Sequence, residues 1–349
     1  MKIQIKFNMK TAIISGICGQ DGAYLAKLLL DSGYKVIGAE RRSASGSAWR
    51  LEKLGIKERV FLEDFELLES STMLNILKKY NPDEFYNLAA QSFVKASFET
   101  PIFTGNVTGL GVTRILEAIR SFNPEIRFYQ ASSSEMFGKV VETPQTELTP
   151  FYPRSPYAAA KLYGHWMAVN YREAYNMFCS NGILFNHESP IRGKEFVTKK
   201  ITSTLTKIKL GLAECLELGN LSAKRDWGFA GDYVEAMHLM LTMDKPDDYV
   251  IATGETHSVE EFVELSCQFL GLDTIWEGEG EQRVLIDLNS NKKIVKVNKD
   301  FYRPAEVDLL IGNSAKAKKE LGWTPRHSFE SLVEMMIQDD IDVLKKQTK

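Results

Sequence analysis

The chain has 349 residues, of which 44% are hydrophobic and 26% charged, and its formal net charge is -3. These values are typical of a soluble globular protein with one large domain or two smaller ones, and they give no reason to expect nucleic acid as a partner. No apolar run approaches the roughly 18 residues that span a bilayer, and the N-terminal residues lack the core of a signal peptide. The four widely spaced cysteines predict no metal site or disulfide framework and favour a reduced, cytoplasmic setting.

A glycine turn stands near the start of the chain. An apolar run over residues 11–15 leads into Gly16-Ile17-Cys18-Gly19-Gln20-Asp21-Gly22, and residues 23–30 are apolar at helical spacing. A strand, a glycine turn and a helix in this order predict a dinucleotide site, because glycine lets the backbone approach the pyrophosphate and the helix N-terminus supplies N–H donors. We therefore expect a cofactor to lie against Gly16, Gly19, Gln20, Asp21 and Gly22; a plain turn is the alternative.

The end of the second predicted strand, residues 35–39, bears on the choice of cofactor. Glu40 is the acidic residue that normally takes the ribose hydroxyls of NAD, whereas Arg41 and Arg42 suit the 2′-phosphate of NADP. Because planar guanidinium groups match phosphate oxygens well, we predict NADP and keep NAD as the alternative.

Further strands are predicted over residues 60–65, 84–90 and 127–132, separated by helical patterns such as residues 107–120. This alternation predicts an α/β fold with a doubly wound parallel (Rossmann) sheet. Ligands in such sheets bind beyond the carboxyl ends of the strands. The residues that we expect there, beside the cofactor, are Asp64, Phe65, Leu88, Ala89 and Ala90.

Two polar motifs follow the fifth strand. Ser132-Ser133-Ser134-Glu135 is at the mouth of the predicted site, where a serine cluster is usually turn chemistry but Glu135 can both give and take protons. The Ser-Pro pair at residues 155–156 is a good helix start, and Tyr157 and Lys161 then share one face of the helix. An ammonium group favours a neighbouring tyrosinate, so the pattern predicts a tyrosine prepared for proton transfer.

The helix continues through Trp166, Tyr171 and Tyr175, an aromatic stripe that we interpret as core. A sixth strand is predicted over residues 182–185. It is followed by His187, which taken alone is more typical of a hydrogen-bonded structural histidine than of a catalyst.

The strict alternation of strands and helices decays after the sixth strand, although helices are still predicted over residues 255–271 and 314–321. We expect a Rossmann domain over residues 9–185, to which later segments around 215–250 return, and a smaller, interleaved C-terminal α/β substrate domain mainly over residues 186–340. Dispersed cations in this part are either a solvated surface or the site of a second diphosphate. They are Arg192, Lys199, Lys200, Lys224, Arg225 and Arg303.

The glycine turn together with Tyr157-x-x-x-Lys161 resembles the extended short-chain dehydrogenase/reductase family. Longer runs narrow the resemblance to the GDP-mannose 4,6-dehydratases, from Lys10 to about Arg326. These runs are residues 87–92 (NLAAQS), 150–157 (PFYPRSPY), 182–190 (GILFNHESP), 219–221 (GNL), 224–228 (KRDWG), 232–237 (DYVEAM) and 301–304 (FYRP).

The resemblance implies a hydro-lyase that converts GDP-mannose to GDP-4-keto-6-deoxymannose and water. Tyr157, helped by Lys161, would take the proton of the sugar 4-hydroxyl while hydride passes from C4 to NADP. Glu135 would then take the C5 proton and protonate the departing 6-hydroxyl, hydride would return to C6, and Ser133 would hydrogen-bond the 4-hydroxyl. The family implies a homodimer or homotetramer with no nucleic-acid or membrane partner.

By the same resemblance, the cofactor would also contact Ser92, His187 and Arg192. The GDP-sugar would be surrounded by Ser92, Ser133, Glu135, Asn186, Arg192, Lys200, Arg225, Arg303 and Glu306.

The chain departs from the family's usual residues at Ser133, Phe93 and Ile191, where threonine, histidine and arginine are usual, and in the loop over residues 43–50. Three alternatives therefore remain. One is a dehydratase of another GDP-sugar, such as a GDP-manno-heptose, and another is a sugar-nucleotide 4-epimerase or 4-reductase on the same fold. The third, a catalytically silent nucleotide sensor, would be expected to have lost Tyr157 or Lys161.

Overall fold

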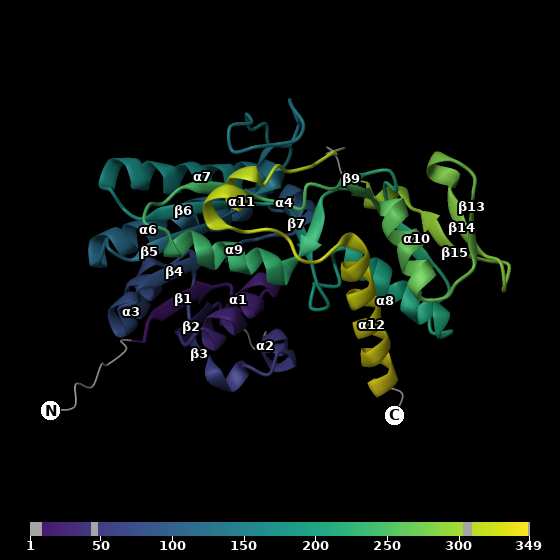
Figure 1. Ribbon diagram of the computed structural model, residues 1–349, viewed down its shortest axis with the longest axis horizontal. Helices are drawn as coiled ribbons and strands as arrows, with labels where there is room; N and C mark the ends of the chain where they lie inside the picture. Colours follow the sequence, from purple (N-terminus) through teal and green to yellow (C-terminus); the bar gives the residue numbers. More distant parts are fainter. Residues whose placement is uncertain (1–8, 43–47, 303–308, 348–349) are drawn as a thin grey trace.

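The computed structural model describes residues 9–42, 48–302 and 309–347. Its largest element is a seven-stranded sheet with the strand order β11-β6-β5-β4-β1-β2-β3 (Figure 1). In chain order these strands are β1 (Thr11–Ser15), β2 (Lys35–Glu40), β3 (Phe61–Asp64), β4 (Glu84–Asn87), β5 (Arg127–Ser133), β6 (Cys179–Leu184) and β11 (Asp248–Ile251). Each neighbouring pair of these strands is parallel.

Helices cover both faces of the sheet, and each face has its own apolar core (Figure 1). On one face lie α1 (Gln20–Asp31), α9 (Ala230–Thr242) and α11 (Ala315–Leu321), and on the other α3 (Ser70–Tyr80), α6 (Gly111–Phe122) and α7 (Pro156–Tyr175). Successive strand residues point to opposite faces, so Ile14 joins the first core and Ile13 the second. The predicted doubly wound parallel sheet is therefore confirmed.

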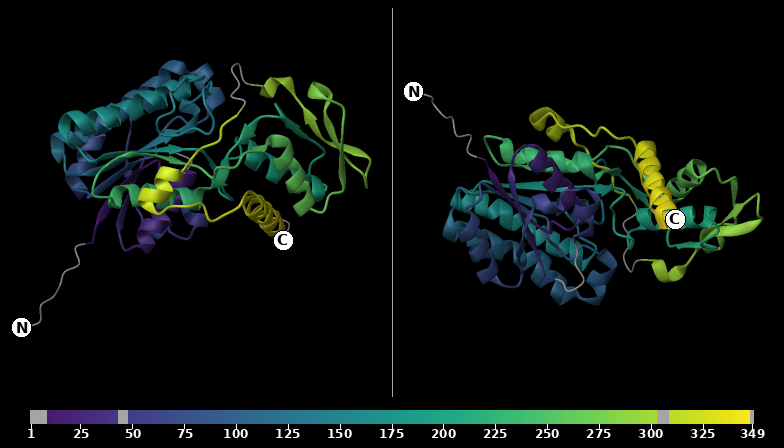
Figure 2. Two further views of the ribbon diagram at one scale, coloured as in Figure 1. Left: turned by 45° about the horizontal axis from the view of Figure 1, so that its top comes forward. Right: turned by 90° about the horizontal axis from the view of Figure 1, so that it is seen from below.

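A smaller α/β unit lies beside the large sheet (Figure 2). Its four-stranded sheet has the order β13-β14-β15-β8, and its helices pack around an apolar core that includes Trp227 and Phe262. The strands are β8 (Leu216–Leu218), β13 (Thr274–Glu277), β14 (Val284–Asp287) and β15 (Lys292–Val297), and the helices are α8 (Val197–Lys209), α10 (Val259–Phe269) and α12 (Phe329–Gln347). None of the described helices is long and apolar enough to cross a membrane.

Two short ladders lie between these sheets. β7 (Asn186–Glu188) pairs with β10 (Trp227–Phe229), and β9 (Lys224–Arg225) pairs with β12 (His257–Ser258). The remaining helices are α2 (Trp49–Lys53), α4 (Val94–Glu99), α5 (Pro101–Thr104), the π-helix η2 (Gly105–Leu110) and the 3-10 helices η1 (Lys57–Arg59), η3 (Ser134–Met136), η4 (Gly280–Gln282) and η5 (Lys299–Phe301).

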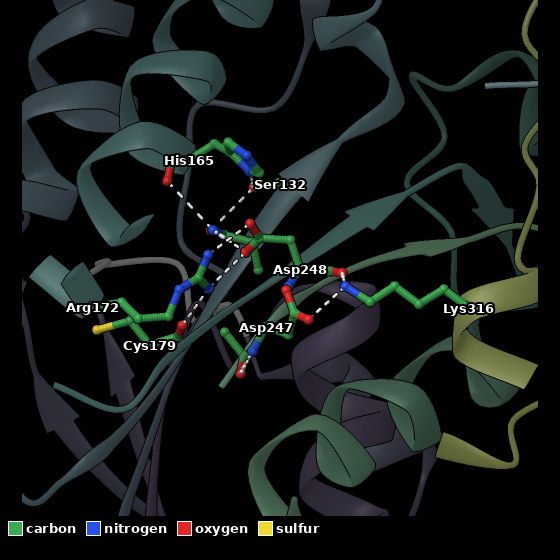
Figure 3. Close-up of polar contacts among 9 residues, drawn as sticks. Ser132, His165, Arg172, Cys179, Asp247, Asp248 and Lys316 are labelled. Atoms are coloured by element: carbon green, nitrogen blue, oxygen red, sulfur yellow. Dashed lines mark hydrogen bonds and ion pairs between the residues drawn. The ribbon is translucent and has the colours of Figure 1, made fainter. Parts of the chain in front are cut away.

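The segment around residues 215–250 divides between the two units. β8 belongs to the four-stranded sheet, whereas α9 and β11 lie on the seven-stranded one. The edge strand β11 is tied down by charge (Figure 3): Arg172 of α7 forms two hydrogen bonds of 2.9 and 2.8 Å with the carboxylate of Asp248, and Lys316 of α11 pairs with Asp247 at 2.7 Å. These contacts attach the start of β11, a strand from a distant part of the chain, to the end of α7 and to α11.

Two sequence predictions differ from the structure. In the predicted aromatic core stripe only Tyr171 is buried, while Trp166 and Tyr175 are 54% and 50% exposed because they lie on the outer side of α7. The helix predicted from residue 255 begins only at Val259, since Ser258 caps it through a reciprocal bond with Glu261. An i,i+4 pattern does not by itself say whether another element covers the face.

Candidate active site

The glycine turn joins β1 to α1 with a backbone that other residues could not adopt. Gly16 has φ +74, and a Cβ there would lie 2.9 Å from the backbone nitrogen of Ala89, while a Cβ at Gly22 would overlap the carbonyl of Gly16. Gly19 donates its N–H to the Gly16 carbonyl at 2.9 Å and caps α1 without a side chain. The first N–H groups of α1 therefore receive no side-chain cap from Gly19, an arrangement that suits a phosphate group.

A cavity of about 350 Å³ opens beside this turn, at the carboxyl ends of β1, β4, β5 and β6. The structure brings most of the predicted cofactor and catalytic residues together in its lining. They are Gly16, Gly19, Gln20, Asp21, Gly22, Leu88, Ala90, Ser92, Ser133, Glu135, Tyr157, Lys161, Asn186, His187 and Arg192. Ala89 packs against the glycine turn behind it.

Besides Ala89, four other predicted cofactor residues do not line this cavity. Arg41 and Arg42 are exposed just after β2, Asp64 is exposed at the end of β3, and Phe65 is buried beside it. They lie at or just after the carboxyl ends of β2 and β3. These two strands are paired in parallel, from Ile37 opposite Phe61 to Glu40 opposite Asp64. This is the same edge of the sheet as the glycine turn, farther along it.

Tyr157 and Lys161 reach the cavity from the first two turns of α7. The helix starts as expected, because Ser155 Oγ accepts from the N–H of Ala158 at 3.0 Å and Pro156 occupies the first helical position. The ammonium of Lys161 donates to the carbonyl of Ala131 at 2.7 Å, and burial lowers its pKa from 10.5 to about 8.

Burial governs the pKa of Tyr157 as well. It raises this pKa above the ordinary 10, and the nearby charge of Glu135 raises it further, while a hydrogen bond with Ser133 opposes the change. The net shift is opposite to the one expected from Lys161 alone, because burial dominates it; Lys161 Nζ bonds to the backbone and stands 5.8 Å from the centre of the tyrosine ring. Ser133 also accepts from the backbone N–H of Glu135 at 3.2 Å, so the serine hydroxyl contacts both the tyrosine and the turn that carries Glu135.

Asp21 and His187, which also line the cavity, form an ion pair. Nε2 of His187 is 2.8 Å from Oδ2 of Asp21, and Gln20 bonds to both residues. Burial by itself raises the pKa of Asp21, but the charge and hydrogen bond of His187 outweigh it and bring the pKa to about 2. Burial lowers the pKa of His187, but Asp21 outweighs it and raises that pKa above 6.5.

A second cavity of about 470 Å³ adjoins the first and shares Asn186 and Arg192 with it. Its lining combines cations with aromatic rings: Lys200 lies 3.6 Å from the centre of the Phe301 ring, and Arg192 lies 3.6 Å from that of Phe196. Arg225 is buried in the same lining. The predicted substrate residues Arg303 and Glu306 lie outside the described residues.

Asn186 offers an observation independent of the cavity shape. Its Oδ1 atom is buried and has no hydrogen-bond partner among the described residues. A buried amide oxygen of this kind costs free energy unless a partner arrives, so the position suits a polar ligand. No group of three or more histidine, cysteine or acidic side chains in the described part of the chain has metal-binding geometry.

Sequence reasoning missed several lining residues. The guanidinium of Arg50 donates to the carbonyls of Ile191 and Cys18 at 2.7 and 3.0 Å and so stands beside the glycine turn. Val94, Glu195 and Phe196 line both cavities. No contiguous motif marks these positions. For Arg50, the sequence indicated only that it follows the second predicted strand, on the side of the sheet where the strands end and ligands bind.

Comparisons with known proteins agree with this geometry. A family model described as GDP-mannose 4,6 dehydratase matches residues 13–336. The chain is 51% identical over 342 residues to the GDP-mannose 4,6 dehydratase of Homo sapiens, which covers 96% of this chain and 92% of that protein. It is 51% identical over 343 residues to the GDP-mannose 4,6-dehydratase of Sinorhizobium fredii (strain HH103), with coverage of 96% and 98%.

A solved structure, the dTDP-glucose 4,6-dehydratase of Bacillus anthracis in complex with NAD, superposes with a TM-score of 0.80 at 20% identity. The match covers 97% of this chain and 100% of that one. At this identity the likeness establishes the fold.

Proposed function

The chain belongs to the GDP-mannose 4,6-dehydratase family, and from that premise we propose how its residues carry out the reaction. The protein is a hydro-lyase that converts GDP-mannose to GDP-4-keto-6-deoxymannose and water. The observation that carries the proposal is the convergence of Ser133, Glu135, Tyr157 and Lys161 with the glycine turn on one cavity.

The turn and cavity fit a nicotinamide dinucleotide. The absent side chains at Gly16 and Gly22 leave room for close backbone approach, and the start of α1 would receive the pyrophosphate. The chemistry supplied by the bound nicotinamide is reversible hydride transfer, first from C4 and finally back to C6. Tyr157 and Lys161, which line the same cavity, would face the hydroxyl that is oxidised.

Each catalytic side chain has one proposed task. Tyr157 takes the proton of the 4-hydroxyl, which Ser133 holds by a hydrogen bond, and Lys161 supplies the positive charge that favours the phenolate. Once C4 is a ketone, the C5 proton is acidic; Glu135 removes it and delivers a proton to the departing 6-hydroxyl, which leaves as water. When hydride returns to C6, C5 takes up a proton. The two protons removed, from the 4-hydroxyl and from C5, therefore equal the two delivered, to the departing hydroxyl and to C5.

NADP is the cofactor that we favour. The carboxylate of Glu40 is turned toward the glycine turn, where it accepts from the N–H of Cys18 at 3.4 Å, and burial raises its pKa. A carboxyl in that position is poorly placed to take both ribose hydroxyls. Arg41 and Arg42 are exposed just beyond it and suit a 2′-phosphate. Mass spectrometry of the dinucleotide released from the purified protein decides the point: NADP supports this choice, and NAD overturns it.

We assign the GDP-sugar to the larger cavity. The diphosphate would meet Lys200 and Arg225, Asn186 would bond the sugar end, and Arg192 stands where the two cavities meet. Residues 9–185 with α9 and β11 would then hold the cofactor, and the rest of residues 186–340 would hold the GDP-sugar. Phe93 and Phe196, whose rings are 6.2 Å apart, line the wall next to the junction and would help set which hexose fits.

An exposed apolar surface supports self-association as a dimer or tetramer. It consists of Ile102, Phe103, Leu110, Tyr163 and Trp166, which are 40–86% exposed on the packed helices α5, η2 and α7. A second copy covering this surface would bury most of it. Light scattering of the purified protein tests the assembly, with Trp166→Lys expected to shift it toward the monomer. We also infer a cytoplasmic enzyme, because all four cysteines are free thiols.

One experiment tests the reaction itself. Purified protein incubated with GDP-mannose should yield a product lighter by one water with no net consumption of NADPH, and an unchanged sugar nucleotide would overturn the assignment. A parallel incubation with a GDP-manno-heptose tests the alternative substrate. Glu135→Gln separates the dehydratase from a 4-epimerase or 4-reductase, since only the dehydratase needs that carboxyl group for turnover.

A further inference from the structure

His187 stands between two groups that can only accept hydrogen bonds. Its Nδ1 is 2.7 Å from the carbonyl oxygen of Phe185, and its Nε2 is 2.8 Å from Oδ2 of Asp21. A neutral imidazole carries one N–H and could satisfy only one of these acceptors. We propose that His187 is held as an imidazolium whose fixed charge balances Asp21 on the cofactor side of the cavity, so that His187 acts as a positioning residue through Asp21.

The surroundings keep the ring in this orientation. It stacks on Tyr233 of α9 with 4.6 Å between the ring centres and an interplanar angle of 25°. A cation over an aromatic face is favourable. Gln20 fixes the other side: its amide donates to Oδ1 of Asp21 and to the backbone carbonyl of His187, both at 3.0 Å, and accepts from Ser189 Oγ at 2.7 Å.

The charged groups around the pair come from several elements. Arg192, in the segment after β7, opposes the charge of His187, and Asp21 at the start of α1 favours it. Tyr233 faces the ring from α9, and the charge of Asp21 contributes to the raised pKa of Tyr129 in β5. With Asp21 ionised well below neutral pH, its attraction exceeds the cost of burial and the repulsion of Arg192.

Two other buried or half-buried histidines show the contrast. Nδ1 of His165 is 3.1 Å from the hydroxyl of Ser132, and Nδ1 of His238 is 3.3 Å from that of Tyr86. A hydroxyl can donate or accept, so neither site demands a second proton, and burial lowers the pKa of both histidines. The requirement for an imidazolium therefore distinguishes His187 from them.

The charge matters because Asp21 acts on the catalytic groups. Its carboxylate raises the pKa of Tyr157 and of Lys161. An imidazolium paired with Asp21 weakens that field, whereas a neutral residue at position 187 would leave it unopposed. This consequence rests on the proposed function; the protonation state of His187 does not.

The first experiment therefore needs no turnover. Nitrogen-15 NMR of the histidine rings in the purified holoenzyme, with His187 assigned from the signals lost in His187→Gln, should show both of its nitrogens protonated at pH 7. His165 and His238 in the same sample should show neutral rings. A neutral tautomer at His187 at pH 7 would overturn the proposal even if the enzyme proved fully active.

The second experiment measures the alkaline-side midpoint of the kcat profile, which reports Lys161. His187→Gln should move it upward by about half a pH unit or more, since the unopposed charge of Asp21 raises the pKa of Lys161. Asp21→Asn should move it downward, and adding Asp21→Asn to His187→Gln should bring it back down. Loss of activity with no movement of the midpoint, or upward movement in both single variants, would contradict the proposal. Thermal melting of each variant checks that the fold is retained.

Discussion

The two adjoining cavities are built in different ways. The smaller one takes most of its lining from short contiguous motifs at the ends of parallel strands, namely the glycine turn, Ser133–Glu135 and the start of α7. The larger one collects one to three residues from each of many elements, namely α4, β7, α8, β8, β9, β10, α10 and η5. Bond making needs a few groups held at fixed positions, which a strand end and the following turn provide. Recognition of a long ligand is spread over many weaker contacts.

Their charged groups differ in the same way. In the smaller cavity Tyr157, Lys161 and Asp21 are all buried enough for their pKa values to be shifted. In the larger cavity burial also lowers the pKa of Lys200, but Lys200 and Arg192 lie against the faces of aromatic rings. A tyrosine, lysine and carboxylate gathered in one cavity are suited to proton transfer, and a cation held against a ring is suited to binding an anion. We therefore expect substitutions in the first cavity to lower kcat and those in the second to raise KM.

Tyr157→Phe should produce the largest effect. It removes the proton acceptor for the 4-hydroxyl while keeping the ring in place, so kcat should fall by about 10³–10⁴-fold. The dissociation constant for GDP-mannose, measured by calorimetry, should stay within about threefold, because the phenol contributes little to ground-state binding.

Tyr163→Phe is the matched control for this change, since Tyr163 is on the same helix but 40% exposed. Its kcat should equal that of the unmodified enzyme. A Tyr157→Phe variant that retained kcat and lost affinity would reverse the roles that we assign to the two cavities.

The alkaline side of the pH profile should report Lys161. Burial lowers its pKa to about 8, so the ammonium is present below that pH and is lost as the pH rises through it. Because the positive charge favours the phenolate, kcat should decline above pH 8, by about tenfold for each further unit. The measurement is kcat at saturating GDP-mannose from pH 6 to 10. A profile that remains flat to pH 10 would mean that the charge of Lys161 is not used.

Lys200→Met should affect binding in the second cavity. The methionine keeps much of the apolar contact with Phe301 but removes the charge offered to a diphosphate. The KM for GDP-mannose should rise about tenfold, as for the loss of one charge-assisted hydrogen bond, with kcat unchanged within about twofold.

Lys207→Met is the control for that variant. Lys207 lies on the same helix, α8, but is exposed and does not line the cavity. Its KM should not change. If both variants raised KM equally, the effect would come from the general charge of the helix and the second cavity would lose its distinct role.

The contrast between the cavities also explains what the sequence could predict. The strand, glycine turn and helix around Gly16 are adjacent in the chain, as are Ser155 and Tyr157, so local chemistry predicts both their structure and their place at the sheet edge. Phe93 was noted only as a departure from a family pattern, and the contact of Arg192 with Phe196 was not predicted. The positions of Arg50 and of the edge strand β11 depend on contacts between residues more than 60 apart in sequence. Periodicity carries no information about such contacts.

A third region, remote from both cavities, gives the smallest expected effect on catalysis. Asp248→Asn breaks the ion pair with Arg172 that fastens β11 to the far end of α7 (Figure 3). Burial raises the pKa of Asp248, but Arg172 outweighs it and the net shift is downward. The stabilisation is therefore present above the unfolded-state pKa of about 4 and is lost as the pH falls through the lower folded-state pKa.

The variant should lower the free energy of unfolding by about 2 kcal/mol at pH 7, measured by urea denaturation, with a smaller difference at pH 3. Asp247→Asn, which removes the more exposed pair with Lys316, should cost about 0.5 kcal/mol or less. Both should keep kcat and KM once folded, because Tyr157 stands more than four helical turns away along α7. A drop in kcat for Asp248→Asn without loss of stability would show that the far end of α7 positions the tyrosine, and the division between chemistry and recognition would then extend beyond the cavities themselves.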